Sequence, residues 1–127
     1  MKTALITGGS AGLGKITAET LAKQGYRVII AARDLEKGER VVEEIKSASK
    51  DAVVEFMSVD MAEYESVSDF SEAISSRFES LDLLILNAGL FTSSIRKNSA
   101  GHEYMFAATH MGHFLLTHKL LPLLRKS

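Results

Sequence analysis

A glycine-rich segment near the start of the chain restricts its fold more than any other feature. Residues 7–14 read TGGSAGLG, with the glycines spaced Gly8-x3-Gly12-x-Gly14. The segment follows a short apolar run, TALIT, and precedes a helical pattern that stops at Gly25. The residues expected on one face of that helix are Leu13, Ile16, Thr20 and Leu21. A glycine loop between a strand and a helix is typical of doubly wound α/β folds.

Each glycine of this loop has a mechanical use. Gly8 lets the chain turn away from the strand, Gly12 lets the backbone approach a pyrophosphate, and Gly14 lets helix and strand pack closely. The N-terminus of the following helix offers N–H groups and partial positive charge to phosphate, and Ser10 can add a hydroxyl donor. A tight turn without a ligand is the alternative. We expect a dinucleotide to contact Gly8, Ser10, Gly12, Leu13 and Gly14.

Strand-like and helix-like segments alternate along the whole chain. Apolar runs predict four strands, at residues 3–7, 26–32, 52–59 and 81–86. Asp34 and Ser66 can cap two of the helices between them, and a long final helix is expected over about residues 99–124, with Pro122 near its end. This order predicts a parallel sheet covered by helices on both faces, in one domain over residues 1–127.

Three further motifs accompany the glycine loop. They are Asp60 with Met61 at the end of the third strand, Asn87-Ala88-Gly89 at the end of the fourth, and THMGHFLLTHKLLPLL over residues 109–124. Together the four motifs resemble the short-chain dehydrogenase/reductase family, in its retinol-dehydrogenase-like branch, over residues 2–127. The resemblance implies a Rossmann-like fold, a nicotinamide dinucleotide cofactor, and a place for Asp60 against the adenine ring.

The motif positions also make physical sense in a doubly wound sheet of strand order 3-2-1-4. That order places the first and fourth strands side by side where the order reverses, and ligands bind at the carboxyl ends of strands at such a point. The glycine loop and Asn87-Ala88-Gly89 would then face one crevice. Taken alone, Asp60 is also a common cap or turn residue, and Asn87-Ala88-Gly89 a common strand-ending turn.

Arg33 bears on the choice between two nucleotides. An acidic residue at the end of the second strand accepts hydrogen bonds from the ribose of NAD, whereas an arginine accommodates the 2′-phosphate of NADP. The sequence there is Ala31-Ala32-Arg33-Asp34. We favour NADP over NAD, although Asp34 could pair with Arg33 or cap the next helix, and Arg33 could be a solvated charge.

The residues that the family uses for carbonyl reduction are missing from this sequence. The resemblance implies a Ser, together with a Tyr and a Lys in the pattern Tyr-x3-Lys. The residues four positions after Tyr26, Tyr64 and Tyr104 are Ile30, Ser68 and Ala108. Thr109 stands where the family has an Asn that organises a proton-relay water. We therefore expect a nucleotide-binding chain that is inactive alone.

Composition excludes several other kinds of protein. There is no cysteine, so disulfides and thiolate sites are absent. A net charge of -1 gives no reason to expect nucleic acid as a partner. No segment is long and apolar enough to span a membrane, and the cytosol is the default location. His110 and His113 have a spacing that can bind metal, but we expect no metal site, because no carboxylate lies near them.

The fourth strand and the final helix bear on how the chain assembles. A sheet that ends at the run LDLLIL leaves an apolar edge, and the apolar residues of the final helix occupy more than one face. We therefore expect a homo-oligomer, formed through that helix or the fourth-strand edge. The expected function is the NADP(H)-binding portion of an oxidoreductase for a carbonyl or alcohol substrate of unspecified kind. The alternative is a non-catalytic nucleotide-binding or interaction module.

Overall fold

The computed structural model describes residues 1–89 and 92–127. Its sheet has four parallel strands, β1 (Thr3–Thr7), β2 (Arg27–Ala32), β3 (Val53–Ser58) and β4 (Leu83–Ile85). Their order is β3-β2-β1-β4, as predicted, and Leu5 of β1 pairs with Ile29 on one side and Leu84 on the other. The sequence therefore predicted the strand order, and the structure adds the register.

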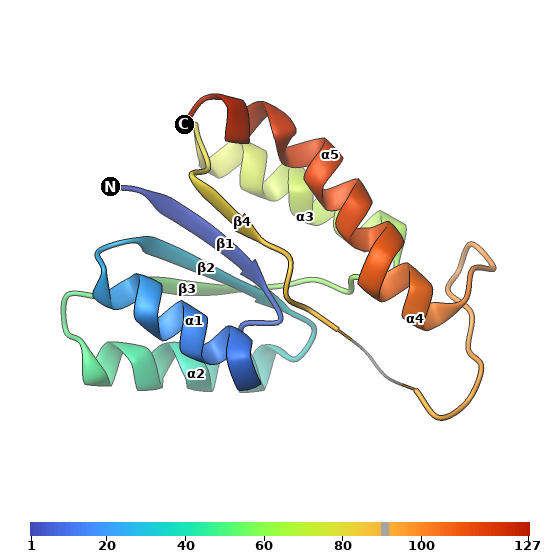
Figure 1. Ribbon diagram of the computed structural model, residues 1–127, viewed down its shortest axis with the longest axis horizontal. Helices are drawn as coiled ribbons and strands as arrows, with labels where there is room; N and C mark the ends of the chain where they lie inside the picture. The colour runs from blue at the N-terminus through green and yellow to red at the C-terminus, as the bar shows by residue number, and fades with distance from the viewer. Residues whose placement is uncertain (90–91) are drawn as a thin grey trace.

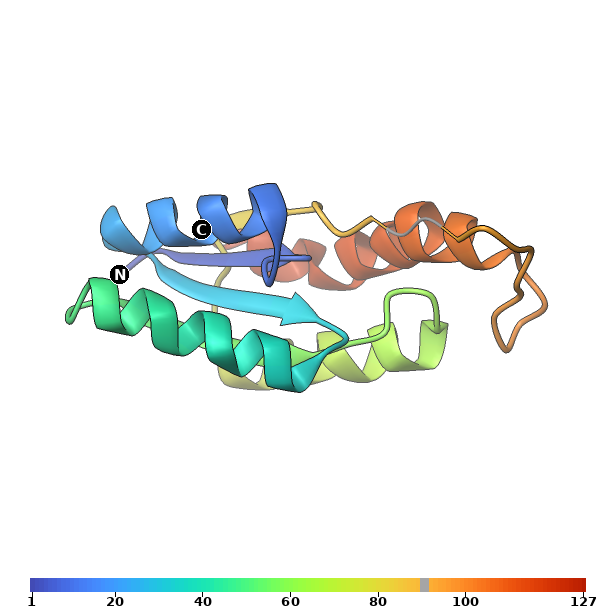
Figure 2. The same cartoon turned by 90° about the horizontal axis from the view of Figure 1, so that it is seen from below.

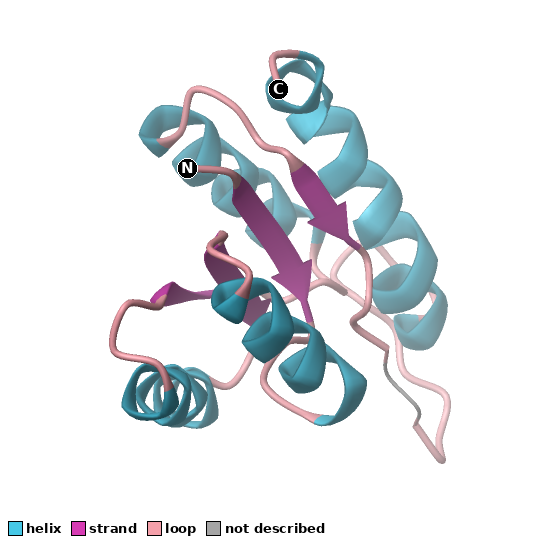
Figure 3. Cartoon of the chain, turned by 60° about the vertical axis from the view of Figure 1, so that its left-hand side comes forward, coloured by secondary structure: helices cyan, strands magenta, loops and turns pink. Residues whose placement is uncertain are grey.

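Helices cover both faces of the sheet (Figures 1 and 3). Helices α1 (Gly12–Lys23) and α2 (Leu35–Ala48) pack on one face, and α3 (Tyr64–Arg77) and α5 (Gly112–Arg125) pack on the other. Successive residues of β1 alternate between the two layers, with Ile6 facing α1 and α2 and Leu5 facing α3 and α5. Because both faces are buried, the three middle residues of the strand are all apolar.

Two predicted details of the helices need correction. Leu13 and Ile16 of α1 are 78% and 59% exposed, and the buried face consists of Gly14, Ala18, Leu21 and Ala22. The helix therefore presents mostly its small residues to the sheet. Ser66 does not cap α3: the helix starts earlier, after Glu63, and the Ser66 hydroxyl accepts a hydrogen bond from the Asp60 N–H at 3.0 Å.

The final helix also starts later than predicted. Residues 99–103 form a turn in which the Asn98 side chain accepts hydrogen bonds from the N–H groups of Ala100 and His102, and Gly101 takes a positive φ of 81°. Helix α4 (Tyr104–Phe106) then begins, with the Glu103 carboxylate accepting its first N–H groups. A π-helical turn, η1 (Ala107–Met111), joins it to α5. Figure 2 shows residues 92–103, in orange, beyond the ends of the strands.

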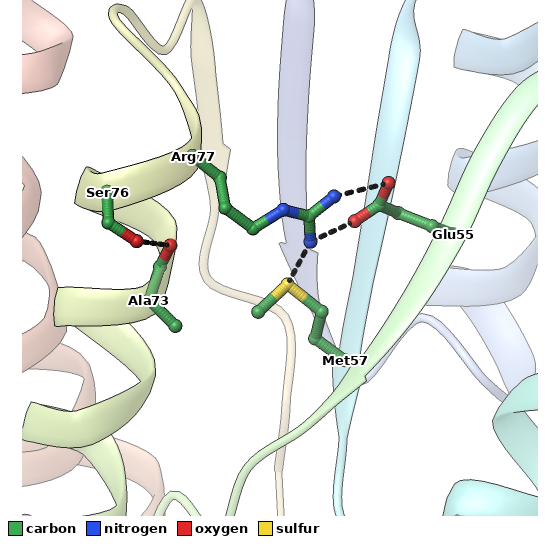
Figure 4. A network of polar contacts seen from close by, with 5 residues as sticks. All are labelled: Glu55, Met57, Ala73, Ser76 and Arg77. Atoms are coloured by element: carbon green, nitrogen blue, oxygen red, sulfur yellow. Dashed lines mark hydrogen bonds and ion pairs between the residues drawn. The ribbon is translucent and has the colours of Figure 1, made fainter.

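Ion pairs connect neighbouring elements on both faces of the sheet. The Arg77 guanidinium of α3 meets both carboxylate oxygens of Glu55 on the edge strand β3, at 2.6 and 3.0 Å, and also lies 3.3 Å from the Met57 sulfur (Figure 4). On the opposite face, Lys15 of α1 lies 2.6 Å from Glu44 of α2. Hydrogen bonding to the partner carboxylate and its charge raise the pKa of both cations. Both pairs are exposed enough for solvent to screen them strongly.

Candidate nucleotide-binding site

A cleft of about 550 Å³ lies at the carboxyl ends of the strands. It is lined by nine of the residues predicted from the sequence, namely Gly8, Ser10, Gly12, Arg33, Asp60, Met61, Asn87, Ala88 and Gly89. The remaining two do not line it. Leu13 points outward from α1, and Gly14 is buried behind the loop. The strand order therefore brings the segments that follow all four strands to one site.

The glycine loop is held tightly against the end of β4. Gly8 has a φ of 71°, and its carbonyl accepts a hydrogen bond from Asn87 Nδ2 at 3.2 Å. A Cβ on Gly14 would overlap both that carbonyl and Asn87 Nδ2. Gly14 was predicted to allow helix–strand packing. Its actual neighbours are the loop itself and the strand-ending Asn87.

The start of α1 is suited to an anion. Ala11 occupies the cap position and provides no side-chain acceptor, and the first turn contains no acidic residue. In the part of the chain that the structure describes, no side-chain cap therefore competes for these N–H groups. The partial positive charge of the helix N-terminus adds to their attraction for phosphate. The loop residues therefore fit the pyrophosphate of a dinucleotide.

The hydroxyl of Thr7 connects β1 to the loop that follows β4. It accepts hydrogen bonds from the N–H groups of Asn87 and Ala88, both at 3.0 Å, and lies 2.9 Å from Nε2 of the buried His113. The two N–H groups occupy the lone pairs of the hydroxyl, so its proton must point to Nε2. This arrangement assigns the proton of the neutral imidazole to Nδ1, which donates to the Thr109 carbonyl at 3.1 Å.

Arg33 and Asp34 take separate roles at the end of β2. The Asp34 carboxylate accepts a hydrogen bond from the Lys37 N–H at 3.0 Å and caps α2. Of the two predicted roles of Asp34, pairing with Arg33 or capping the next helix, the structure shows the cap. Arg33 Nη1 instead donates to the Tyr104 hydroxyl at 2.7 Å. Asp34 therefore caps the helix, and both Asp34 and Arg33 line the cleft.

Three polar side chains of the cleft were not predicted from the sequence, nor were its remaining apolar lining residues. Lys37 reaches it from the first turn of α2, and Arg96 and Tyr104 reach it from the segment that precedes and begins α4. Lys37 could have been found, because Asp34 predicted that the helix starts there. Arg96 and Tyr104 could not have been found in this way, because no local sequence pattern predicts where the segment before α4 runs.

Comparison with known proteins agrees with this geometry. The sequence model of the family described as short chain dehydrogenase matches residues 2–127. The chain belongs to the short-chain dehydrogenase family. Retinol dehydrogenase 12 of Bos taurus is 40% identical to it over 126 residues, which cover 99% of this chain and 40% of that protein. This chain thus spans about 40% of the length of that curated relative.

Solved structures of similar proteins have the same fold. L-sorbose reductase from Gluconobacter frateurii, solved with NADPH and L-sorbose, is 28% identical, with a TM-score of 0.81 over 98% of this chain and 48% of that one. A metagenomic short-chain oxidoreductase solved with NADP is 26% identical, with a TM-score of 0.82 over 96% of this chain and 56% of that one. Both agree with the family assignment and the Rossmann-like fold.

Thr109 lies in η1 and not on the wall of the cleft. Its hydroxyl donates to the Met105 carbonyl at 2.6 Å, so the side chain serves its own helix. Its backbone carbonyl is the acceptor for His113.

Metal sites and membrane spans are the remaining features to consider. Within residues 1–89 and 92–127, no three His, Asp or Glu side chains gather as a metal site. No helix in the same residues is long and apolar enough to cross a membrane.

Proposed function

We propose that this chain is the NADP(H)-binding portion of an oxidoreductase that acts on a carbonyl or alcohol substrate. The observation that carries the proposal is the distribution of charge at the end of β2. Arg33, Asp34 and Lys37 all line the cleft there, and Oδ1 of the Asp34 carboxylate caps α2. Two cations beside an engaged carboxylate suit a 2′-phosphate better than a ribose hydroxyl.

The other predicted residues are assigned to the rest of the dinucleotide. Gly8, Ser10, Gly12 and the start of α1 would hold the pyrophosphate, with Leu13 and Gly14 completing the loop. Asp60 and Met61 would border the adenine ring, and Asn87-Ala88-Gly89 would lie toward the nicotinamide. Two structural neighbours are described as complexes with NADPH or NADP, which supports the choice of nucleotide.

The chemistry of the family needs more than this cleft. A bound nicotinamide supplies or accepts a hydride, and a protein acid must protonate the oxygen of the reduced carbonyl. The Tyr-x3-Lys pattern is not in the sequence, and Thr109 uses its hydroxyl within its own helix. We therefore propose that the chain binds the nucleotide and does not by itself reduce a carbonyl. We also propose a cytosolic location and a homo-oligomeric assembly, as expected from the sequence.

Replacing Arg33 tests the nucleotide assignment. Loss of a hydrogen-bonded cation costs about 1.5–3 kcal/mol, so Arg33→Ala should weaken NADPH binding by about 10- to 100-fold and leave NADH binding nearly unchanged. Titration followed by nucleotide fluorescence measures both. Arg40→Ala is the matched control, because Arg40 is exposed on α2 and its partner is Glu36 at 3.8 Å. Equal binding of NADPH and NADH by the unmodified chain would refute the preference for NADP.

A further inference from the structure

Tyr104 connects the ends of two strands at the cleft. Its hydroxyl accepts the hydrogen bond from Arg33, which follows β2, at 2.7 Å. The same hydroxyl lies 3.5 Å from both carboxylate oxygens of Asp60, which follows β3. A guanidinium can only donate and a carboxylate can only accept. The phenol therefore satisfies Arg33 with its oxygen and leaves its own proton to point toward Asp60.

The ring of Tyr104 is fixed independently of Arg33. It is only 5% exposed and belongs to a small apolar cluster with Ala62, Ala107 and Ala108. The Arg96 guanidinium lies 4.3 Å from the ring centroid, and the Tyr104 N–H donates to the Arg96 carbonyl at 2.8 Å. The hydroxyl is thus held at a fixed place, whereas Arg33 is an exposed side chain at the end of a strand.

We propose that Tyr104 determines nucleotide specificity as a positioning residue, by holding the Arg33 guanidinium where the 2′-phosphate of NADP binds. This inference rests on the proposed function. The contact uses one of the five N–H donors of the guanidinium and leaves four for phosphate oxygens. An exposed arginine without such a contact must be ordered when the ligand binds, and this ordering lowers affinity. Tyr104 removes part of that loss only for nucleotides that carry a 2′-phosphate.

The test compares two probes of the adenosine end of the cleft. Adenosine 2′,5′-bisphosphate carries the 2′-phosphate and 5′-AMP lacks it. Tyr104→Phe keeps the ring beneath Arg96 and removes only the hydroxyl. By calorimetry, the variant should bind the bisphosphate about two- to tenfold more weakly than the unmodified chain does, while its affinity for 5′-AMP changes less than twofold. Circular dichroism melting of each variant checks that the fold is retained.

Two further variants separate positioning from a general effect. Tyr64→Phe removes another phenol, which contacts His102 Nδ1 at 2.6 Å and does not line the cleft, and should leave both affinities unchanged. In an Arg33→Ala background, Tyr104→Phe should have no additional effect, because two residues that act through one contact are not additive.

The outcomes distinguish this inference from the proposed function. If the unmodified chain prefers the bisphosphate and Tyr104→Phe keeps the full preference, the inference is wrong and the function stands. The same holds if Tyr104→Phe lowers the affinity for both probes equally. It also holds if Tyr104→Phe lowers the affinity for the bisphosphate as much in the Arg33→Ala background as in the unmodified chain. If the unmodified chain binds the bisphosphate no better than 5′-AMP, the NADP assignment itself fails.

Discussion

At the residue scale, the Thr7 hydroxyl makes three polar contacts that support the site. One hydroxyl satisfies two backbone N–H groups of the Asn87 loop and the Nε2 atom of buried His113. The sequence identified Asn87, but it could not identify His113 as its indirect support. The two residues meet only through Thr7, and a histidine at helical spacing carries no sign of such a contact.

Removing the Thr7 hydroxyl should therefore be costly. Thr7→Val keeps the shape of the side chain and leaves three polar groups at the strand end without their partner. Each such group costs about 1–3 kcal/mol if it stays dry, and we expect a loss of about 2–4 kcal/mol in the free energy of unfolding, measured with urea. Thr20→Val is the control, because the Thr20 hydroxyl is exposed and bonds only its own helix. Equal stability of the two variants would show that the network contributes nothing.

At the element scale, the sequence predicted strands and helix type better than helix faces and ends. The four apolar runs became strands, shortened at the edge, where β4 pairs only with β1. Asp34 was identified correctly as a cap, because a short acceptor before an amphipathic stretch is a local signal. Ser66 and the inner face of α1 were assigned wrongly, because the Asp60 turn and the close approach of α1 to the sheet are tertiary features.

Gly14 tests that close approach. Within a helix, alanine is normally about 1 kcal/mol more favourable than glycine. In α1, however, the Cβ of Gly14→Ala would overlap the Gly8 carbonyl and Asn87 Nδ2. We therefore expect the opposite sign, a loss of about 1–3 kcal/mol in thermal or urea unfolding. Gly89→Ala should change stability by less than about 0.5 kcal/mol, since no atom of the described residues lies within 4 Å of its Cβ position. Stabilisation by Gly14→Ala would contradict the packing described.

At the scale of the whole molecule, apolar side chains are exposed on the final helical segment and beside the end of β4, among other places. Phe106 and Phe114, near the start of the final helical segment, are 51% and 66% exposed, and Leu86 is exposed beside the end of strand β4. The sequence predicted an excess of apolar residues on the final helix, and these two aromatics are part of it. Exposed patches of this kind favour association.

We expect the chain to self-associate, and two variants distinguish the surfaces. If the final helix is the interface, Phe114→Lys should lower the molar mass measured by light scattering, whereas Leu86→Lys should not. If the β4 edge is the interface, the effects should be reversed. A chain that remains monomeric up to about 100 μM, roughly the range in which weak interfaces form, would refute self-association.

We propose above all that one cleft at the carboxyl ends of the strands binds a dinucleotide. Titrating the ¹⁵N-labelled chain with NADPH, and following the amide signals by NMR, tests it directly. We predict the largest shifts at residues that line this cleft, among them Gly8, Gly12, Arg33, Asp60 and Gly89. Signals that remain unchanged at saturating NADPH, or that move only in the acidic groove around Glu63, Glu65 and Asp69, would contradict it.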